Sequence, residues 1–238
     1  MDQNRYKSSK YIDLEQLAYN IILHGNEERY IDYKSSMSWK DRDVKMVTVK
    51  CILGMSNLPQ GGYIVFGVRQ DGNEFIPDGM EQDYIKTFTK DDIDAFVKNY
   101  AEPYVELRVT VVPRNIVGSA AKNKADMKHI EFSDDGGDFV VIQISEFDEF
   151  PVICDKEGKL KNGELYLREG AMYVRPRGKI ETSEVRTQIE MREIVEMATD
   201  KNLRSFIERM GRAGILELIK PELTDDQKYD NELPKEMR

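Results

Sequence analysis

Cysteine, histidine and tryptophan are scarce in this chain of 238 residues, which contains two cysteines, two histidines and one tryptophan. Two cysteines are too few for the disulfide framework of a small secreted domain or for a thiolate zinc site. Cys51 and Cys154 lie far apart in the sequence, and we expect two buried thiols. His24 and His129 are not spaced as ligands of one ion, so the pattern favours neither zinc chemistry nor a histidine general base.

Long hydrophobic runs are also absent. No segment approaches the ~18 consecutive apolar residues that a membrane-spanning helix needs. Residues 1–5 are not followed by the apolar core of a signal peptide. The composition, 40% hydrophobic and 33% charged, is ordinary for a soluble protein. We therefore expect a cytoplasmic protein with no membrane partner.

Two common catalytic motifs are missing. The phosphate-binding pattern G-x-x-x-x-G-K-[ST] does not occur, and neither does a serine nucleophile elbow. Gly61 and Gly62 precede an apolar stretch, whereas the glycines of a P-loop follow a strand. The pair is expected to allow a tight connection from a helix into a strand, because glycine tolerates positive φ and close backbone approach.

Helical and strand periodicities alternate along the first 180 residues, which predicts an α/β (α+β) domain over residues 1–180. Its mixed sheet should pack against helices. The segment 63–68 is nearly all apolar and is bounded by glycines, so it should be a central strand covered on both faces. Further strands are expected at 31–34, 104–112, 139–144, 152–154, 164–167 and 172–174. Helices are expected at 14–24, at 42–57 after the cap Asp41, and after the cap Thr89.

The remainder of the chain should be a C-terminal helical extension, residues 181–220, followed by an acidic, flexible tail, residues 221–238. One helix should begin after Thr182 or Ser183 and end near Ala198, and a second should cover 202–219. Their apolar side chains either pack on the domain or serve assembly. These side chains are Ile189, Ile194, Leu203, Phe206, Ile207 and Leu216.

Acidic residues and a lysine cluster around two of the expected strands. Glu27 precedes the first strand, and Asp32 and Lys34 lie within it on one face, because side chains alternate along a strand. Asp71 follows the apolar strand at a turn. Clustered carboxylates repel unless a cation neutralises them, and Mg²⁺ prefers oxygen ligands. A divalent-metal site is one interpretation, and surface carboxylates with Lys34 in a local ion pair are the other.

These segments resemble the Schlafen-type AlbA_2 domain family. The resemblance covers residues 12–185 and rests on the pattern E-x-x-x-x-(E/D)-(F/Y)-K at 27–34, on G-G-Y-x-x-x-G-V at 61–68, and on Asp71-Gly72. The strand-turn-strand segment 165–175 also resembles the closing part of the family pattern. One departure is Asp32, where the family more often has glutamate.

The resemblance implies a Schlafen-type nuclease, an endoribonuclease acting on structured RNA such as transfer RNA. Glu27, Asp32, Lys34 and Asp71 would then be catalytic, and the three carboxylates would bind Mg²⁺ or Mn²⁺. The alternative is a non-catalytic nucleic-acid-binding or scaffold subunit of a bacterial antiphage defence or regulatory complex. Because Schlafen proteins form an RNA cleft from two such lobes, the single lobe implies a homodimer or a partner protein.

Positive charge is concentrated locally, although the net charge of the chain is −9. Residues 159–179 contain six lysines or arginines and two glutamates. A local basic face in an acidic protein is the electrostatic footprint of phosphate binding. We therefore predict nucleic-acid contacts here, and the family resemblance implies RNA rather than DNA. The alternative is an ordinary solvated surface. The candidate residues are Arg168, Arg175, Arg177 and Lys179.

Overall fold

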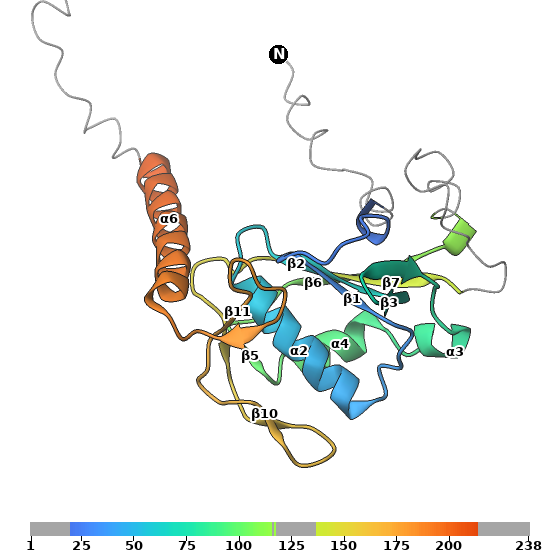
Figure 1. Cartoon of the computed structure of the whole chain (residues 1–238). Helices are drawn as coiled ribbons and strands as arrows, with labels where there is room; N and C mark the ends of the chain where they lie inside the picture. The colour runs from blue at the N-terminus through green and yellow to red at the C-terminus, as the bar shows by residue number, and fades with distance from the viewer. Residues whose placement is uncertain (1–19, 116, 118–136, 214–238) are drawn as a thin grey trace, which may run out of the picture. The chain divides into compact units, whose positions relative to one another are not determined.

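The computed structural model describes residues 20–115, 117 and 137–213 (Figure 1). The described helices are α2 (Arg42–Ser56), α3 (Gln82–Ile85), α4 (Lys90–Val97) and α6 (Gln188–Arg212). The first six strands are β1 (Ile31–Lys34), β2 (Gly62–Phe66), β3 (Val68–Asp71), β4 (Glu74–Pro77), β5 (Ala101–Glu102) and β6 (Leu107–Val112). The others are β7 (Phe139–Ile144), β8 (Ile153–Cys154), β9 (Gly158–Lys159), β10 (Leu165–Leu167), β11 (Tyr173–Val174) and β12 (Ser183–Glu184). The mixed α/β class is confirmed.

A four-stranded mixed sheet, in the order β1-β2-β7-β6, forms the centre of the fold. β1 and β2 are parallel, and the other neighbouring pairs are antiparallel. Helix α2 connects the two parallel strands, since such strands need a crossover. In Figure 1, α2 and α4 lie on the same face of this sheet. Four two-stranded pairs, β3-β4, β5-β8, β9-β10 and β11-β12, complete the described strands.

The connection between α2 and β2 is tight, as the glycine pair predicts. Gly61 has φ +72°, and a Cβ atom there would lie 1.9 Å from the carbonyl oxygen of Ile144. The strand predicted at 63–68 is divided at Gly67, whose φ of +102° turns the chain from β2 into the β3-β4 hairpin. The position therefore requires a glycine, and the apolar run supplies two strands rather than one.

Apolar side chains cover both faces of β2, which confirms its predicted central place. On the face opposite α2, Val65 packs in a cluster with Ile22, Tyr33 and Phe139. On the α2 face, Ile64 and Phe66 are fully buried. Trp39 is also buried, at 2% exposure, and its ring lies 5.7 Å from that of Phe88. Both cysteines are buried free thiols, as expected.

The C-terminal region differs from its prediction. Ser183 lies in β12, paired with β11, and does not cap a helix. One helix, α6, replaces the two expected, and its part from 188 to 212 is continuous. Its true start is marked by Thr187, whose side-chain oxygen accepts a hydrogen bond from the Glu190 backbone N–H at 3.2 Å. Leu216 and the predicted tail lie outside the described residues.

The chain divides into two units between Met197 and Ala198. The sheet and its covering helices belong to the first unit. The described part of the second unit is the end of α6, from Ala198 to Arg212. Within the described ranges, no helix combines the length and apolarity needed to cross a bilayer.

Candidate functional site

The alternation of β1 places Asp32 and Lys34 together, as predicted. Lys34 Nζ lies 2.5 Å from Asp32 Oδ2, and the Asp32 side chain is 10% exposed. Ile31 and Tyr33 point to the opposite face, where both are buried. β1 therefore turns Asp32 and Lys34 toward α2. Its apolar side chains face the buried cluster that contains Val65 and Phe139.

Arg175 enters this charged face from the segment after β11. Its Nη1 lies 3.0 Å from Asp32 Oδ1 and donates to Cys51 Sγ at 3.1 Å. Its Nη2 donates to the Glu28 carbonyl at 3.3 Å. Arg175 is 1% exposed, so the prediction that it contacts phosphates is wrong for this arrangement. It is instead the internal cation that pairs with Asp32.

Glu27 lies at the edge of the same cluster. Its Oε1 accepts a hydrogen bond from the Tyr33 backbone N–H at 2.9 Å. Burial raises the pKa of the Glu27 carboxyl above its usual value, and the nearby Asp32 acts in the same direction. The Tyr33 N–H and the cations Lys34 and Arg175 oppose this rise. Burial therefore makes the Glu27 carboxyl easier to protonate than an ordinary exposed glutamate.

Lys34 and Cys51 show how the cluster distributes charge. Burial opposes the charged form of Lys34, but the Asp32 carboxylate and other nearby groups raise the pKa of Lys34 above its usual value. Burial raises the pKa of the Cys51 thiol to about 12, so this side chain stays neutral and unreactive at neutral pH. The cluster thus combines two cations, Lys34 and Arg175, with two carboxyl groups and a neutral thiol that accepts a hydrogen bond from Arg175.

Asp71 does not join them. It ends β3 in the exposed β3-β4 hairpin, its side chain is 68% exposed, and its Oδ2 lies 3.1 Å from Arg69 Nη1. Among residues 20–115, 117 and 137–213, no three or more His, Cys, Asp or Glu side chains form a group suited to a metal ion. The predicted grouping of Glu27, Asp32 and Asp71 is therefore corrected, because the turn at Gly67 carries Asp71 away on the hairpin.

The donor set also fails to fit the Mg²⁺ or Mn²⁺ that the resemblance implies. Both Asp32 oxygens already face cations, Lys34 on one side and Arg175 on the other. One Glu27 oxygen accepts from the backbone. Divalent ions of this kind need several free oxygen ligands. The groups present in this arrangement are therefore the two ion pairs of Asp32, with Lys34 and with Arg175, and the Glu27 carboxyl with its raised pKa.

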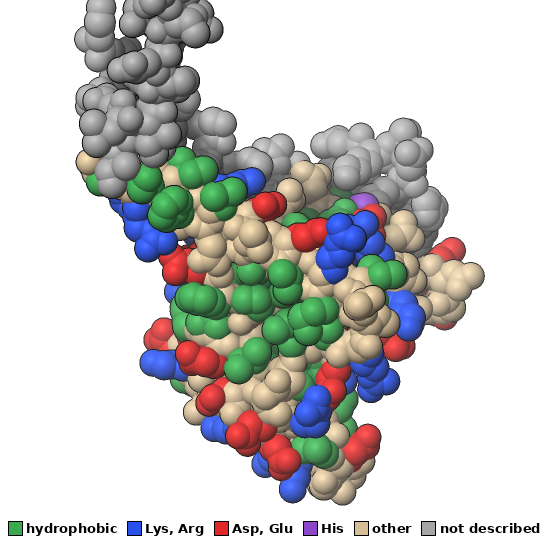
Figure 2. Space-filling model, turned by 90° about the vertical axis from the view of Figure 1, so that its left-hand side faces the viewer, with side chains coloured by type: hydrophobic (Ala, Val, Ile, Leu, Met, Phe, Trp, Pro, Cys, Tyr) green, Lys and Arg blue, Asp and Glu red, His purple; other side chains and the backbone are tan. Residues whose placement is uncertain are grey.

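Three of the four candidate phosphate-binding residues are at the surface. The Arg168 side chain is 59% exposed and pairs with Glu184 at 2.8 Å, and the Arg177 side chain is 77% exposed and lies 3.3 Å from Glu193. Lys179 is exposed. Figure 2 shows, on the face that it draws, lysine and arginine side chains interspersed with acidic ones. Arg168 and Arg177 are thus exposed cations that are paired with acidic side chains, and Lys179 is an exposed cation.

Arg29 was not singled out by sequence reasoning, although it lies inside the 27–34 motif. It donates from Nη1 and Nη2 to the two Glu193 oxygens, both at 2.7 Å, and from Nε to the Arg175 carbonyl. This fork ties the segment before β1 to the first turns of α6 and to the backbone of the buried arginine. No local pattern indicates it, since the partners lie 146 and 164 positions away.

The family model described as "Schlafen, AlbA_2" matches residues 27–177. Because this match covers more than half of the chain and includes both motifs, the chain belongs to the Schlafen AlbA_2 family. The match begins at Glu27 and ends at Arg177, so it encloses the cluster around Asp32 and Arg175.

None of the curated proteins matches the chain. Among solved structures, the DIP2311 protein from Corynebacterium diphtheriae is similar, with 11% identity and a TM-score of 0.35. The similarity covers 66% of this chain and 22% of that protein. At this TM-score, the likeness supports no statement about this chain.

Proposed function

We propose that this Schlafen AlbA_2 protein binds nucleic acid, with RNA favoured, and that the Asp32–Arg175 pair holds the fold rather than a metal ion. The observation that carries the proposal is the set of exposed cations at 159–179 in a chain of net charge −9. Family membership supports the same class of ligand.

The pairing of these cations with carboxylates is compatible with phosphate binding. Exposed ion pairs contribute only about 0–1 kcal/mol, so a phosphate can replace a surface glutamate at little cost. The side chains of Arg168 and Arg177 are 59% and 77% exposed, so a phosphate can reach them from solvent, whereas their partners Glu184 and Glu193 are only 26% and 17% exposed. Binding should then release counterions and weaken steeply as salt is added.

Salt dependence tests this proposal. Arg168→Gln and Arg177→Gln should each weaken binding to a single-stranded RNA and reduce the slope of log K against log salt by about 0.7. Arg69→Gln is the matched control, because Arg69 is an exposed, acid-paired arginine on the β3-β4 hairpin. Glu184→Gln should strengthen binding by about 1.5- to 5-fold, because it frees Arg168 from its partner.

Fluorescence anisotropy across a salt series measures all four variants. Equal salt slopes for the parent, Arg168→Gln and Arg177→Gln would show that these two arginines do not contact the nucleic acid. Absence of any salt-dependent RNA or DNA binding would contradict the proposal and leave a scaffold subunit of a larger complex as the better interpretation.

RNA cleavage is a second candidate, favoured by one observation. Glu27 has a raised pKa and lies beside Lys34, so a proton-transferring carboxyl and a stabilising cation share one cluster. Cleavage of transfer RNA should be assayed with Mg²⁺, with Mn²⁺ and with a chelator. Glu27→Gln should abolish it, whereas Asp71→Asn should not. Cleavage that depends on metal and on Asp71 would restore the three-carboxylate site.

A further inference from the structure

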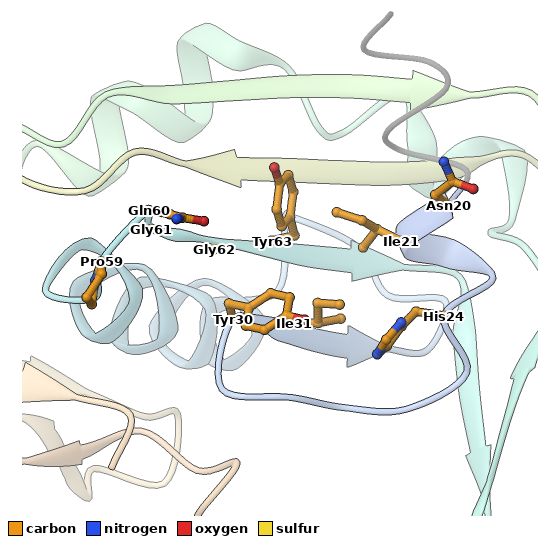
Figure 3. Close-up of a pocket in the computed structure, with 10 residues that line it drawn as sticks. All are labelled: Asn20, Ile21, His24, Tyr30, Ile31, Pro59, Gln60, Gly61, Gly62 and Tyr63. Atoms are coloured by element: carbon orange, nitrogen blue, oxygen red, sulfur yellow. The ribbon is translucent and has the colours of Figure 1, made fainter. Parts of the chain in front are cut away.

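A pocket lies on the face of β1 and β2 opposite the Asp32 cluster. Its volume is about 330 Å³, near the lower end of the ~300–1,000 Å³ typical of small-molecule sites. The turn before β2, the start of both strands and the helical segment at residues 20–22 line it (Figure 3). The lining residues that matter for binding are Asn20, His24, Tyr30, Ile31, Gln60 and Tyr63.

Two tyrosines give this pocket its aromatic character. Tyr30 is 44% exposed, and Tyr63 is partly buried. The Tyr63 backbone N–H donates to the Tyr30 carbonyl at 2.8 Å, so the two residues are fixed at the start of the parallel strand pair. Figure 3 shows both rings among the lining side chains, with Ile31 beside Tyr30. Aromatic faces next to aliphatic groups suit a flat ring.

The polar side chains of the lining are two amides, two tyrosine hydroxyls and the His24 ring. The side-chain amides of Asn20 and Gln60 make no hydrogen bond with any residue in the described part of the chain. His24 Nε2 lies 2.6 Å from Glu28 Oε1. The Glu28 carboxylate also accepts a hydrogen bond from the Tyr30 hydroxyl. The hydrogen bonds from Tyr30 and His24 lower the pKa of Glu28. Glu28 thereby orients two of the lining side chains.

Among the residues that the structure describes, no Lys or Arg lines the pocket, and His24 of the lining is paired with the Glu28 carboxylate. A phosphate is therefore disfavoured here, whereas a neutral, planar group with donor and acceptor edges is suited. Gln60 reinforces this interpretation. It is a non-glycine residue with φ of +68°, held by a hydrogen bond from its backbone N–H to Glu146 Oε2 at 2.7 Å. Glycine would adopt that backbone conformation with less strain. The presence of glutamine there is therefore better explained by a use for its side-chain amide.

We propose that this pocket binds a nucleobase, stacked on Tyr30 and Tyr63 and hydrogen-bonded by Gln60 and Asn20. The inference rests on the proposed nucleic-acid binding, and it adds a base-specific contact to a phosphate-binding surface. The base comes either from an unpaired residue of a bound strand or from a free nucleoside, because both present the same ring.

Calorimetry with adenosine and with uridine tests the free-nucleoside source. Anisotropy with a short single-stranded RNA, and with a strand of equal length carrying abasic sugars, tests the polynucleotide source. Tyr30→Leu should weaken base-dependent binding by about 5- to 150-fold, the range for loss of one stacked base. Tyr30→Phe should retain most of the affinity, since it keeps the ring. Tyr104→Leu is the control, because Tyr104 is 52% exposed and lies outside the pocket.

Gln60→Gly separates recognition from folding. It should raise the Tm, because glycine accepts the positive φ, and it should weaken binding of the base. A Gln60 that served the fold alone would give unchanged binding. If the parent, Tyr30→Leu and Gln60→Gly bind base-containing and abasic strands alike, the pocket is not a base site, and the salt-dependent function stands. Nucleoside binding without strand binding supports the pocket and contradicts the proposed function. Binding of neither overturns both.

Discussion

Asp32 is a carboxylate that two cations hold inside the protein. Lys34 lies on one side and Arg175 on the other, and the Arg175 side chain is 1% exposed. Burying ions costs several kcal/mol each, and close pairing repays this only while both partners are present. Asp71, the other aspartate of the motif region, is at the surface and paired with Arg69. Loss of the negative charge should therefore cost much more folding free energy at Asp32 than at Asp71.

This difference gives a stability prediction. Asp32→Asn should destabilise the fold by about 3–5 kcal/mol, because it leaves Arg175 buried without its counter-charge. Asp71→Asn should change the free energy of unfolding by less than about 1 kcal/mol. Urea unfolding of both variants measures the contrast. In a metal-free carboxylate site, removing one charge would relieve repulsion, so a stabilising Asp32→Asn would contradict the ion-pair interpretation.

Glu27 gives a pH prediction of a definite sign. Burial raises the pKa of its carboxyl in the folded state, so the folded protein binds this proton more tightly than the unfolded chain does. The group therefore favours folding below its usual pKa of 4.5, and this contribution is lost as pH rises through the folded-state pKa. Glu27→Gln keeps an acceptor for the Tyr33 N–H and should stabilise the protein at pH 7.

The stabilisation by Glu27→Gln should shrink as pH falls toward 4. Unfolding free energies of parent and variant at pH 7 and pH 4 measure it. Glu164→Gln is the control, because Glu164 is an exposed carboxylate in the loop before β10. A Glu27→Gln variant less stable than the parent at pH 7 would show that its cation contacts outweigh its burial.

At the scale of elements, the sequence predicts features that depend on neighbouring residues. It does not predict contacts between residues that are far apart in the chain. Asp41 and Thr89 cap α2 and α4 as predicted, because capping involves residues two or three positions apart. The shared face of Asp32 and Lys34 follows from strand alternation. The burial of Arg175 depends on contacts 124 and 143 positions away, which no local periodicity encodes. Asp71 lies on the β3-β4 hairpin, away from Asp32, because the chain turns at Gly67. The positive φ of Gly67 was not predicted from the sequence.

The start of α6 shows how one cap can be mistaken for another. Thr182, Ser183 and Thr187 all precede the helix, but Thr187 carries the acidic partner at the correct spacing. Glu190 Oε2 accepts from the backbone N–H groups of Arg186 and Thr187, which completes a reciprocal box. Ser183 is instead used by the β11-β12 ladder.

A cap test follows from this geometry. Thr187→Ala should reduce the stability of the helix start by about 0.5–2 kcal/mol, because the Glu190 N–H loses its acceptor. Ser183→Ala should have a smaller effect, since Ser183 lies in a strand pair rather than at the cap. Hydrogen exchange of the first turn of α6 reports the change directly. Equal protection in the two variants would place the cap elsewhere.

At the scale of the whole molecule, charge and apolar surface point to partners. The chain has a net charge of −9, so any RNA must meet a local basic face against overall repulsion. Such binding is weak at high salt unless a second contact adds to it. Two surfaces offer such a contact: the pocket lined by Tyr30 and Tyr63, and a second copy of the basic face supplied by another chain.

Assembly through α6 is the last prediction. The described part of the second unit exposes Leu203, Phe206 and Ile207, at 54%, 53% and 46%. Their spacing of three and four positions places them on one stripe of the helix. In the first unit, α6 buries Ile194, at 2% exposure, but it also exposes Ile189 and Val195, at 75% and 51%. Large exposed apolar side chains gathered on one stripe are typical of contact surfaces. We expect the protein to be a homodimer through this stripe.

Light scattering on the full chain measures the mass of the parent and of Phe206→Glu. The substitution should convert a dimer to a monomer, because a charge at the centre of an apolar contact is desolvated without a partner. Tyr104→Glu is the matched control, since Tyr104 is equally exposed at 52% but lies outside α6. The monomer should also bind RNA with a shallower salt slope, because it presents one basic face instead of two. A parent that is monomeric at high concentration, or a Phe206→Glu variant that remains dimeric, would exclude α6 as the assembly surface.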